Sequence, residues 1–144
     1  MAKIKDLIDK LKKTTVRQQE EQVLKILRDD SEWIVDLNRV QLLEGKDSND
    51  NALTEYRSKS YAKFKEKLNP LGVTDLKLTG KFHDSFLLQA REFPIKITAK
   101  DKKTNELVAK YGKDIFGLTD ESKELLIQRL KAKVQDYYRR LIKV

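Results

Sequence analysis

The sequence predicts an α+β fold: a small antiparallel sheet, within about residues 75–112, packed with N-terminal and C-terminal α-helices. Three observations support this prediction. Apolar residues recur at helical spacing on both sides of the middle segment, and inside it apolar and polar residues alternate as in a strand. Residues 75–119 also contain the only histidine and most of the phenylalanines. We therefore expect the middle segment to form the sheet on which the helices lie.

Size and composition indicate one domain with a lean core and a heavily ionised surface. The chain has 144 residues, of which 39% are hydrophobic and 38% charged, with a net charge of +8. This length is enough to bury a core. No apolar run approaches the roughly 20 residues of a membrane span, so we expect no membrane contact. The first 13 residues read as an amphipathic helix, not as a secretory signal.

Helical spacing predicts three helices in the first half. The first covers residues 3–13, with its apolar stripe on Ile4, Leu7, Ile8 and Leu11. The second extends from about Val16 to Leu37, and the Asp29-Asp30-Ser31 sequence is expected to bend or break it, because Asp and Ser favour caps over helix interiors.

A loop and a third helix follow. Residues 44–51 cluster Gly, Asp, Asn and Ser, which are typical of turns. The third helix covers Tyr56 to Leu68, with Tyr61, Phe64 and Leu68 on its apolar side. Pro70 and Gly72 end it.

The sheet is expected to begin with a short strand at Leu76–Leu78. Residues 80–85 read as one turn of helix, with a strand from about Phe86, although a strand through Phe82 and Phe86 is the alternative. The clearest strand covers residues 95–99, just after Pro94. Residues 101–105 read as a polar hairpin turn, and residues 107–111 stay ambiguous.

The last helix begins at Thr119, a hydroxyl cap followed by two acids near the positive end of the helix dipole. We expect a single domain, 1–144, with four parts. These are the N-terminal helices (1–37), a loop plus basic helix (38–72), the sheet region (73–118) and the C-terminal helix (119–144).

No catalytic, metal or cofactor site is evident in the sequence. The chain has no cysteine and one histidine, which argues against a structural zinc site. His83, Asp84 and Ser85 are the residue types of a hydrolase triad, but adjacent side chains do not converge as a triad does. We therefore interpret His83 as a structural or surface residue and expect no enzyme.

Two loops resemble ligand motifs only in part. Residues 47–51 match the start of an EF-hand loop, but Ala52 and Ser58 stand where the glycine and the bidentate glutamate belong, so a solvated turn is favoured. Gly112 and Gly117 enclose an apolar pair without forming a phosphate-binding motif. We expect them to position Ile115 and Phe116 against a core or a neighbouring subunit.

The third helix is the candidate nucleic-acid surface. Basic residues with interleaved aromatic residues are typical of such surfaces. Against this reading, the aromatics fall on the side expected to be buried, and Glu55 and Glu66 dilute the charge. The candidate contacts under this alternative are Arg57, Lys59, Lys63, Lys65 and Lys67.

Three stretches carry a family resemblance: residues 41–56 (QLLEGKDSNDNALTEY), residues 76–86 (LKLTGKFHDSF) and residues 110–119 (KYGKDIFGLT). In this order they resemble small virion proteins of tailed phages and prophages of Bacteroides-type hosts, including the crAss-like phages. They are also similar to the wider tail-completion and neck proteins, which form rings between the capsid portal and the tail. The resemblance covers roughly residues 40–120.

The resemblance implies a non-enzymatic virion protein of the head–tail connector, neck or tail completion site. It would assemble in the cytoplasm of the host bacterium as a homo-oligomeric ring that contacts neighbouring portal or tail proteins, and DNA in the channel is a further possible contact. A closed ring needs two different complementary surfaces on each subunit. The candidate subunit contacts are Phe82, Phe86, Ile115 and Phe116. The alternative function is a basic nucleic-acid-binding module.

Overall fold

The structure, a computed structural model, describes residues 4–6, 8–9, 16–56, 58–69, 71–77 and 80–142. Residues 4–6 and 8–9 are helical, as the sequence predicts for the N-terminal segment, and Leu7 and Leu11 lie outside the described residues. The elements that follow are α2 (Val16–Asp29), α3 (Ser31–Leu43), α4 (Lys59–Leu68), α5 (Lys81–Asp84), β1 (Phe86–Gln89), β2 (Lys96–Ala99), α6 (Thr104–Tyr111), the 3-10 helix η1 (Lys113–Ile115) and α7 (Asp120–Ile142).

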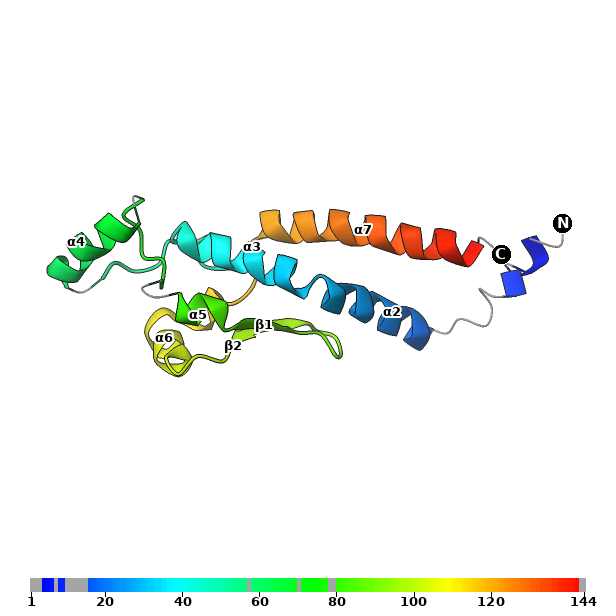
Figure 1. The fold of residues 1–144 in the computed structure, drawn as a ribbon, viewed down its shortest axis with the longest axis horizontal. Coiled ribbons are helices and arrows are strands. Elements are labelled where there is room, and N and C mark those ends of the chain that lie inside the picture. Colours follow the sequence, from blue (N-terminus) through cyan, green and yellow to red (C-terminus); the bar gives the residue numbers. More distant parts are fainter. Residues whose placement is uncertain are drawn as a thin grey trace.

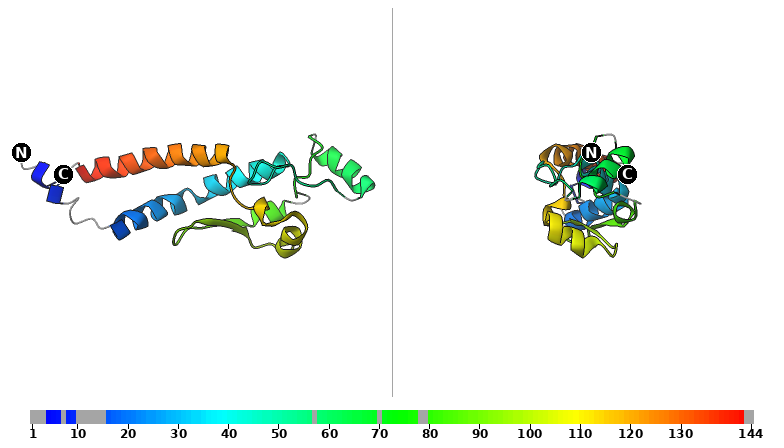
Figure 2. Two further views of the ribbon diagram at one scale, coloured as in Figure 1. Left: turned by 180° about the vertical axis from the view of Figure 1, so that it is seen from behind. Right: turned by 90° about the vertical axis from the view of Figure 1, so that its left-hand side faces the viewer.

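The molecule is elongated along the line of α2 and α3 (Figure 1). In Figure 1 and in both views of Figure 2, α7 runs along one side of these two helices, and the β1–β2 hairpin with α6 lies on the other side. Helix α4 projects at the end of the molecule opposite to the start of α2 and the end of α7. The α+β class expected from the sequence is confirmed.

Asp30 breaks the long helix into α2 and α3, as the sequence predicts. Its carboxylate is almost buried and accepts hydrogen bonds from Arg129 of α7, at 2.9 and 3.2 Å, and from Lys133. The Arg129 guanidinium also lies 4.6 Å from the centre of the Trp33 ring. The break therefore supplies the polar contact that attaches α7 to the rest of the fold.

Helix α3 ends at Leu43, six residues beyond the predicted end. Its extra turns bury the amides of Asn38 and Gln41. Asn38 donates to Ile115 O and accepts from Gly117 N, each at 2.9 Å. Gln41 donates to Gly117 O at 3.0 Å and accepts from Thr119 N at 2.9 Å. These four bonds pair the connection after η1 with α3.

The sheet has two antiparallel strands, with Phe86 opposite Ala99 and Gln89 opposite Lys96. The turn of helix before Phe86 is confirmed as α5, and so is the strand after Pro94. Two predictions are wrong. Leu76 has a left-handed φ of 58° and Lys77 is in no strand, while Leu78 lies outside the described residues. Residues 101–103 lead into helix α6, so no hairpin forms there.

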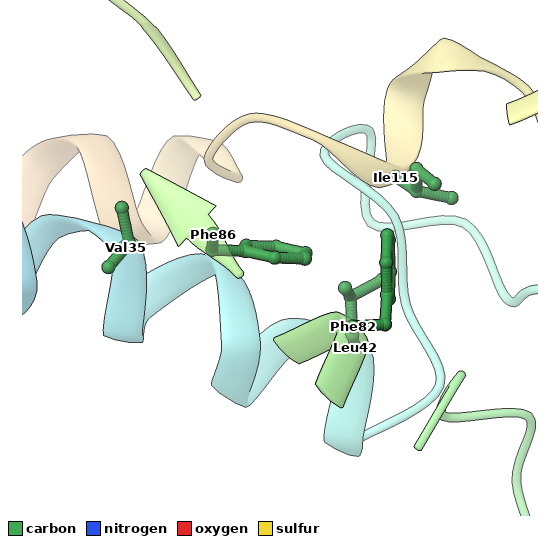
Figure 3. Packing of buried hydrophobic residues seen from close by; sticks show 5 residues of the cluster. All are labelled: Val35, Leu42, Phe82, Phe86 and Ile115. Carbon is green, nitrogen blue, oxygen red and sulfur yellow. The ribbon is translucent and has the colours of Figure 1, made fainter. Parts of the chain in front are cut away.

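Two small clusters form the core. The first contains Val35, Leu42, Phe82, Phe86 and Ile115, which come from α3, α5, β1 and η1 (Figure 3). The second contains Leu27, Ile34, Ala90 and Leu118, with Leu126 and Leu130 of α7 packed against it. In Figure 3, Phe86 of the hairpin lies between Val35 of α3 and Phe82 of α5, so its ring joins these three elements.

The chain exposes far more surface than a compact protein of its mass. Its accessible surface is 10510 Å², whereas a compact monomer of 16.9 kDa exposes about 7,700 Å². The elongated arrangement of α2, α3 and α7 contributes to this difference, because much of each helix faces solvent. Within the described residues, no helix combines the length and the apolar character of a membrane span.

Candidate functional site

Helix α4 buries a lysine and exposes its aromatic residues. Ser58 caps it, with its side-chain oxygen accepting a hydrogen bond from Tyr61 N at 3.2 Å. Lys65 is 2% exposed, whereas Tyr61, Phe64 and Leu68 are 37%, 49% and 53% exposed. The sequence predicts the reverse, because apolar spacing alone places Tyr61, Phe64 and Leu68 on the buried side. That prediction is wrong.

The reason is a polar network around Asp75. The Lys65 ammonium donates to Asp75 Oδ1 at 2.7 Å and also to Lys77 O. Asn69 donates to Asp75 Oδ2, and the backbone N–H of Lys77 donates to Oδ1, each at 2.9 Å. A buried ion pair with this many further hydrogen bonds offsets much of its desolvation cost. It holds α4 to the segment before α5.

The same network shifts two pKa values. Burial acts to raise the pKa of Asp75, but the hydrogen bonds from Lys65, from Lys77 N–H and from Asn69 outweigh it, so the pKa lies below its ordinary value. Burial, reinforced by the negative charge of Asp75, raises the pKa of Tyr56 to about 12. At neutral pH Asp75 is therefore ionised and Tyr56 keeps its proton.

His83 is a structural residue. It is 4% exposed, its Nε2 lies 2.8 Å from Asp75 O, and its ring stacks on Phe86 with ring centres 5.8 Å apart. Burial lowers the pKa of His83, so the ring is neutral at pH 7. Ser85 Oγ donates to Phe82 O at 2.8 Å and does not meet the imidazole. These contacts position α5 and the start of β1.

A cleft of about 670 Å³ opens between the start of α4, α5 and α6. We call it the lysine–tyrosine cleft. Leu76, Phe82 and Leu107 line it with apolar surface, and Tyr56 and Tyr61 meet edge to face in it, with ring centres 5.0 Å apart. Its remaining lining residues are Ser58, Lys77, Gly80, Lys81, Asp101, Lys102, Lys103, Lys110 and Tyr111.

The cleft is strongly positive. Its lining has five lysines, all exposed, and Asp101 is the only acid among the lining residues. Lys110 Nζ lies 5.4 Å from the centre of the Tyr111 ring. Because like charges gathered around a hollow focus the field there, the cleft attracts negatively charged surfaces and ligands. Its lining contains cations, tyrosine rings and apolar surface, an arrangement that suits binding of a negatively charged surface or ligand that also carries apolar groups.

The candidate nucleic-acid contacts separate into three groups. Lys59, Lys63 and Lys67 are exposed on α4 and remain available. Lys65 is paired with Asp75 in the interior, so its assignment as a contact is wrong. Arg57 lies outside the described residues.

The candidate subunit contacts are mostly core residues of the chain itself. Phe82, Phe86 and Ile115 are 5%, 3% and 0% exposed, so these three side chains are occupied by the core and offer a neighbour almost no surface, and their assignment is corrected. Phe116 is half-buried and packs against the same cluster, with its ring centre 5.3 Å from that of Phe86. Of the two alternatives for Ile115 and Phe116, docking against a core is the one observed.

The opposite charge gathers at the start of α7. We define the acidic face as Asp50, Asp120, Glu121 and Glu124, all exposed. Asp50, Asp120 and Glu121 line one shallow hollow, and Lys123 is the only base among its lining residues. Leu125 follows on the same helix and is 51% exposed. Thr119 caps α7 as predicted, with Oγ1 accepting from Ser122 N at 3.2 Å.

The loop before this face is a fixed turn. Asp47 Oδ1 accepts hydrogen bonds from Asn49 N at 2.9 Å and Asn51 N at 3.0 Å. Asn49 donates to the Asp114 carboxylate at 3.0 Å, which ties the turn to η1. The carboxylate of Asp47 is thus used within its own turn. No group of three or more potential metal-ligating side chains occurs among the described residues.

The main site feature that the sequence analysis missed is the cleft. Its lysines come from two segments, around residues 77–81 and 101–110, for which the sequence predicts a strand end followed by a helical turn, and a hairpin turn followed by an ambiguous stretch. The dense lysines at residues 100–103 were the available signal.

Comparison with protein-family models, with curated proteins and with solved structures finds no match to this chain.

Proposed function

We propose that the chain is a non-enzymatic structural subunit of a tailed-phage virion, which acts by assembling into a ring at the head–tail neck or tail completion site. The carrying observation is the exposed area: 10510 Å² against about 7,700 Å² for a compact monomer, an excess of about 2,800 Å². A subunit in a closed ring covers two surfaces, each about 800 Å² for a standard interface. The excess is large enough to supply both.

The distribution of apolar surface supports the same proposal. Ten hydrophobic residues are buried among the described residues, and a two-stranded sheet is at most marginally stable alone. Large apolar side chains remain exposed on α4 and α7, among them Phe64, Leu68, Leu125 and Ile127. Single exposed apolar residues are normal, but neighbouring ones, such as Phe64 and Leu68 four residues apart on α4, are the feature that marks a surface buried against another protein.

The placement in a phage neck rests on the family resemblance of residues 40–120. Two of the three stretches that carry it are structural in this fold. LKLTGKFHDSF contains α5 and the first residue of β1, and KYGKDIFGLT forms the end of α6, η1 and the connection paired with Asn38 and Gln41. Their role is to shape a backbone. This agrees with a function based on geometry, not on chemistry.

The assembly state of the purified chain tests this proposal. Native mass spectrometry and light scattering should find closed oligomers whose population rises with concentration, and negative-stain images should show rings. Mass spectrometry of virions should detect the chain. A strict monomer at tens of micromolar that is absent from particles would overturn the proposal.

A second candidate function is nucleic-acid binding, which the exposed lysines of α4 favour. Lys59, Lys63 and Lys67 are exposed beside Tyr61 and Phe64, which are exposed as well. Affinity for DNA should then fall steeply with salt. Replacing the three lysines by Glu should abolish binding in a fluorescence anisotropy titration, and no binding of the wild type in low salt would eliminate this candidate.

A further inference from the structure

We infer that the lysine–tyrosine cleft of one copy receives the acidic face at the start of α7 of the next copy. This inference rests on the proposed function, because it names the contact through which the ring would form. Apart from Phe82, which lines the cleft and is 5% exposed, no residue of the cleft or of the acidic face is one that the sequence assigns to subunit contacts.

The first argument is charge. Five lysines face one aspartate in the cleft, whereas the acidic face presents four exposed acids beside Lys123, one of which, Asp50, also pairs with Lys46 at 3.3 Å. The chain as a whole is basic, with a net charge of +8, so an acidic surface is the unusual feature. Complementary charges on two surfaces fix register and speed association.

The second argument is apolar fit. The cleft contains apolar surface at Leu76, Phe82 and Leu107, and Tyr61 stands at its edge with 37% exposure. On the acidic face, Leu125 lies four residues after Glu121, on the same side of α7, and is 51% exposed. An apolar residue flanked by acids thus matches an apolar hollow surrounded by lysines.

The third argument is the placement of the two surfaces. Helix α7, which carries most of the acidic face, and helix α6, which contributes Lys110 to the cleft, lie on opposite sides of the line of α2 and α3 (Figures 1 and 2). The two surfaces are therefore carried by elements on different sides of the molecule. Because the two surfaces differ, their contact is heterologous, and repeating it closes a ring when the rotation allows.

Nucleic acid is the other occupant that the cleft would attract. It would pair with the lysines but would leave the acidic face and Leu125 exposed, and it would bring phosphates close to Asp101. A second copy accounts for both surfaces at once. The observations therefore favour the second copy.

A charge-swap experiment tests the inference. The cleft variant is Lys102→Glu with Lys103→Glu, and the helix variant is Glu121→Lys with Glu124→Lys. Both replaced pairs are exposed, and Lys102 and Lys103 precede α6, where acids favour the helix dipole. The matched control, Lys25→Glu with Lys96→Glu, changes net charge as the cleft variant does but lies on α2 and β2.

Sedimentation velocity and native mass spectrometry at about 0.15 M salt, where the Debye length is about 8 Å, supply the readout. Each swapped variant alone should associate at least about tenfold more weakly than the wild type, because like charges then oppose each other. An equimolar mixture of the two should recover assembly with alternating subunits, and the control should assemble like the wild type. Circular dichroism melts confirm that each variant folds.

The outcomes separate the inference from the function on which it rests. A wild type that stays monomeric overturns both. A wild type that assembles while both swapped variants assemble equally well overturns the inference alone. Failure of the mixture to recover assembly also overturns it, and loss of binding to a fluorescent oligonucleotide in the cleft variant would then assign the cleft to nucleic acid.

Discussion

Replacing Lys65 by Met should destabilise the fold strongly, although lysine is usually a surface residue. The side chains of Lys65 and Asp75 are 3% and 4% exposed and form an ion pair at 2.7 Å. Removing one partner of a buried pair leaves the other charge uncompensated and typically costs about 3–5 kcal/mol. Met preserves the apolar stem, and Asp75 keeps its bonds from Asn69 and Lys77 N–H. We therefore expect the lower end, about 3 kcal/mol.

Thermal and urea unfolding followed by circular dichroism measure this loss. For a chain of this size, 3 kcal/mol corresponds to a fall in Tm of about 10 °C. Lys63→Met is the matched control, because Lys63 lies on the same helix and is exposed. It should change the free energy of unfolding by less than about 0.5 kcal/mol. Equal effects of Lys65→Met and Lys63→Met would refute the burial of Lys65.

The pH dependence of the same variant follows from the pKa of Asp75. That pKa is lowered in the folded chain, so the carboxylate stabilises the fold above its unfolded value of about 3.9. This contribution is lost as the pH falls through the lower, folded value. Wild type and Lys65→Met should therefore differ fully at pH 7 and converge as the pH falls below about 3.9.

Three further substitutions test other parts of the fold. Asn38→Leu leaves Ile115 O and Gly117 N without their side-chain partners and should lower the free energy of unfolding in urea by about 2–4 kcal/mol. Amide hydrogen exchange in the residues after η1 should become faster, and unchanged exchange there would contradict the pairing with α3. Asp30→Asn removes the negative partner of two half-exposed cations on α7, Arg129 and Lys133, and should lower the free energy of unfolding by about 1 kcal/mol. Because the pKa of Asp30 is lowered, mainly by the hydrogen bond from Arg129, the difference from the wild type should be present at pH 7 and vanish in acid, and tryptophan fluorescence can follow the unfolding. Gly112 has a φ of +90° and open space around it, so Gly112→Ala should lower the free energy of unfolding by about 1–2 kcal/mol through backbone strain alone. Gly45→Ala should lower it further, because Gly45 has a φ of +77° and the new Cβ would also lie 2.6 Å from Val73 Cβ; equal melting temperatures of the two variants would refute the clash.

Local sequence was sufficient where a structural signal acts within a few residues. The break at Asp30, the hydroxyl cap at Thr119, the short helix before Phe86 and the strand after Pro94 were predicted and are observed. Each depends on side chains that bond or clash with nearby backbone, or on an alternation of apolar residues that is visible in the sequence. The α+β class follows from these elements.

Prediction was wrong where a partner distant in the sequence decided the outcome. The extra turns of α3 depend on amides at Asn38 and Gln41 whose partners lie more than 70 residues away. No hairpin turn forms at residues 101–105, because helix α6 begins at Thr104, and its Leu107 and Val108, which the sequence leaves ambiguous, pack on the core cluster of Phe82 and Phe86. Spacing along the chain does not reveal such contacts.

The amino-acid sequence by itself determined the class of fold, its main breaks and caps, and the positive charge of the chain. The tertiary structure alone decided which side of α4 faces inward and where the lysines gather. The physical reason is that burial depends on the partner: Lys65 enters the interior because Asp75, ten residues later, compensates its charge. Tyr61 and Phe64 consequently face outward, beside a cleft assembled from three separate segments.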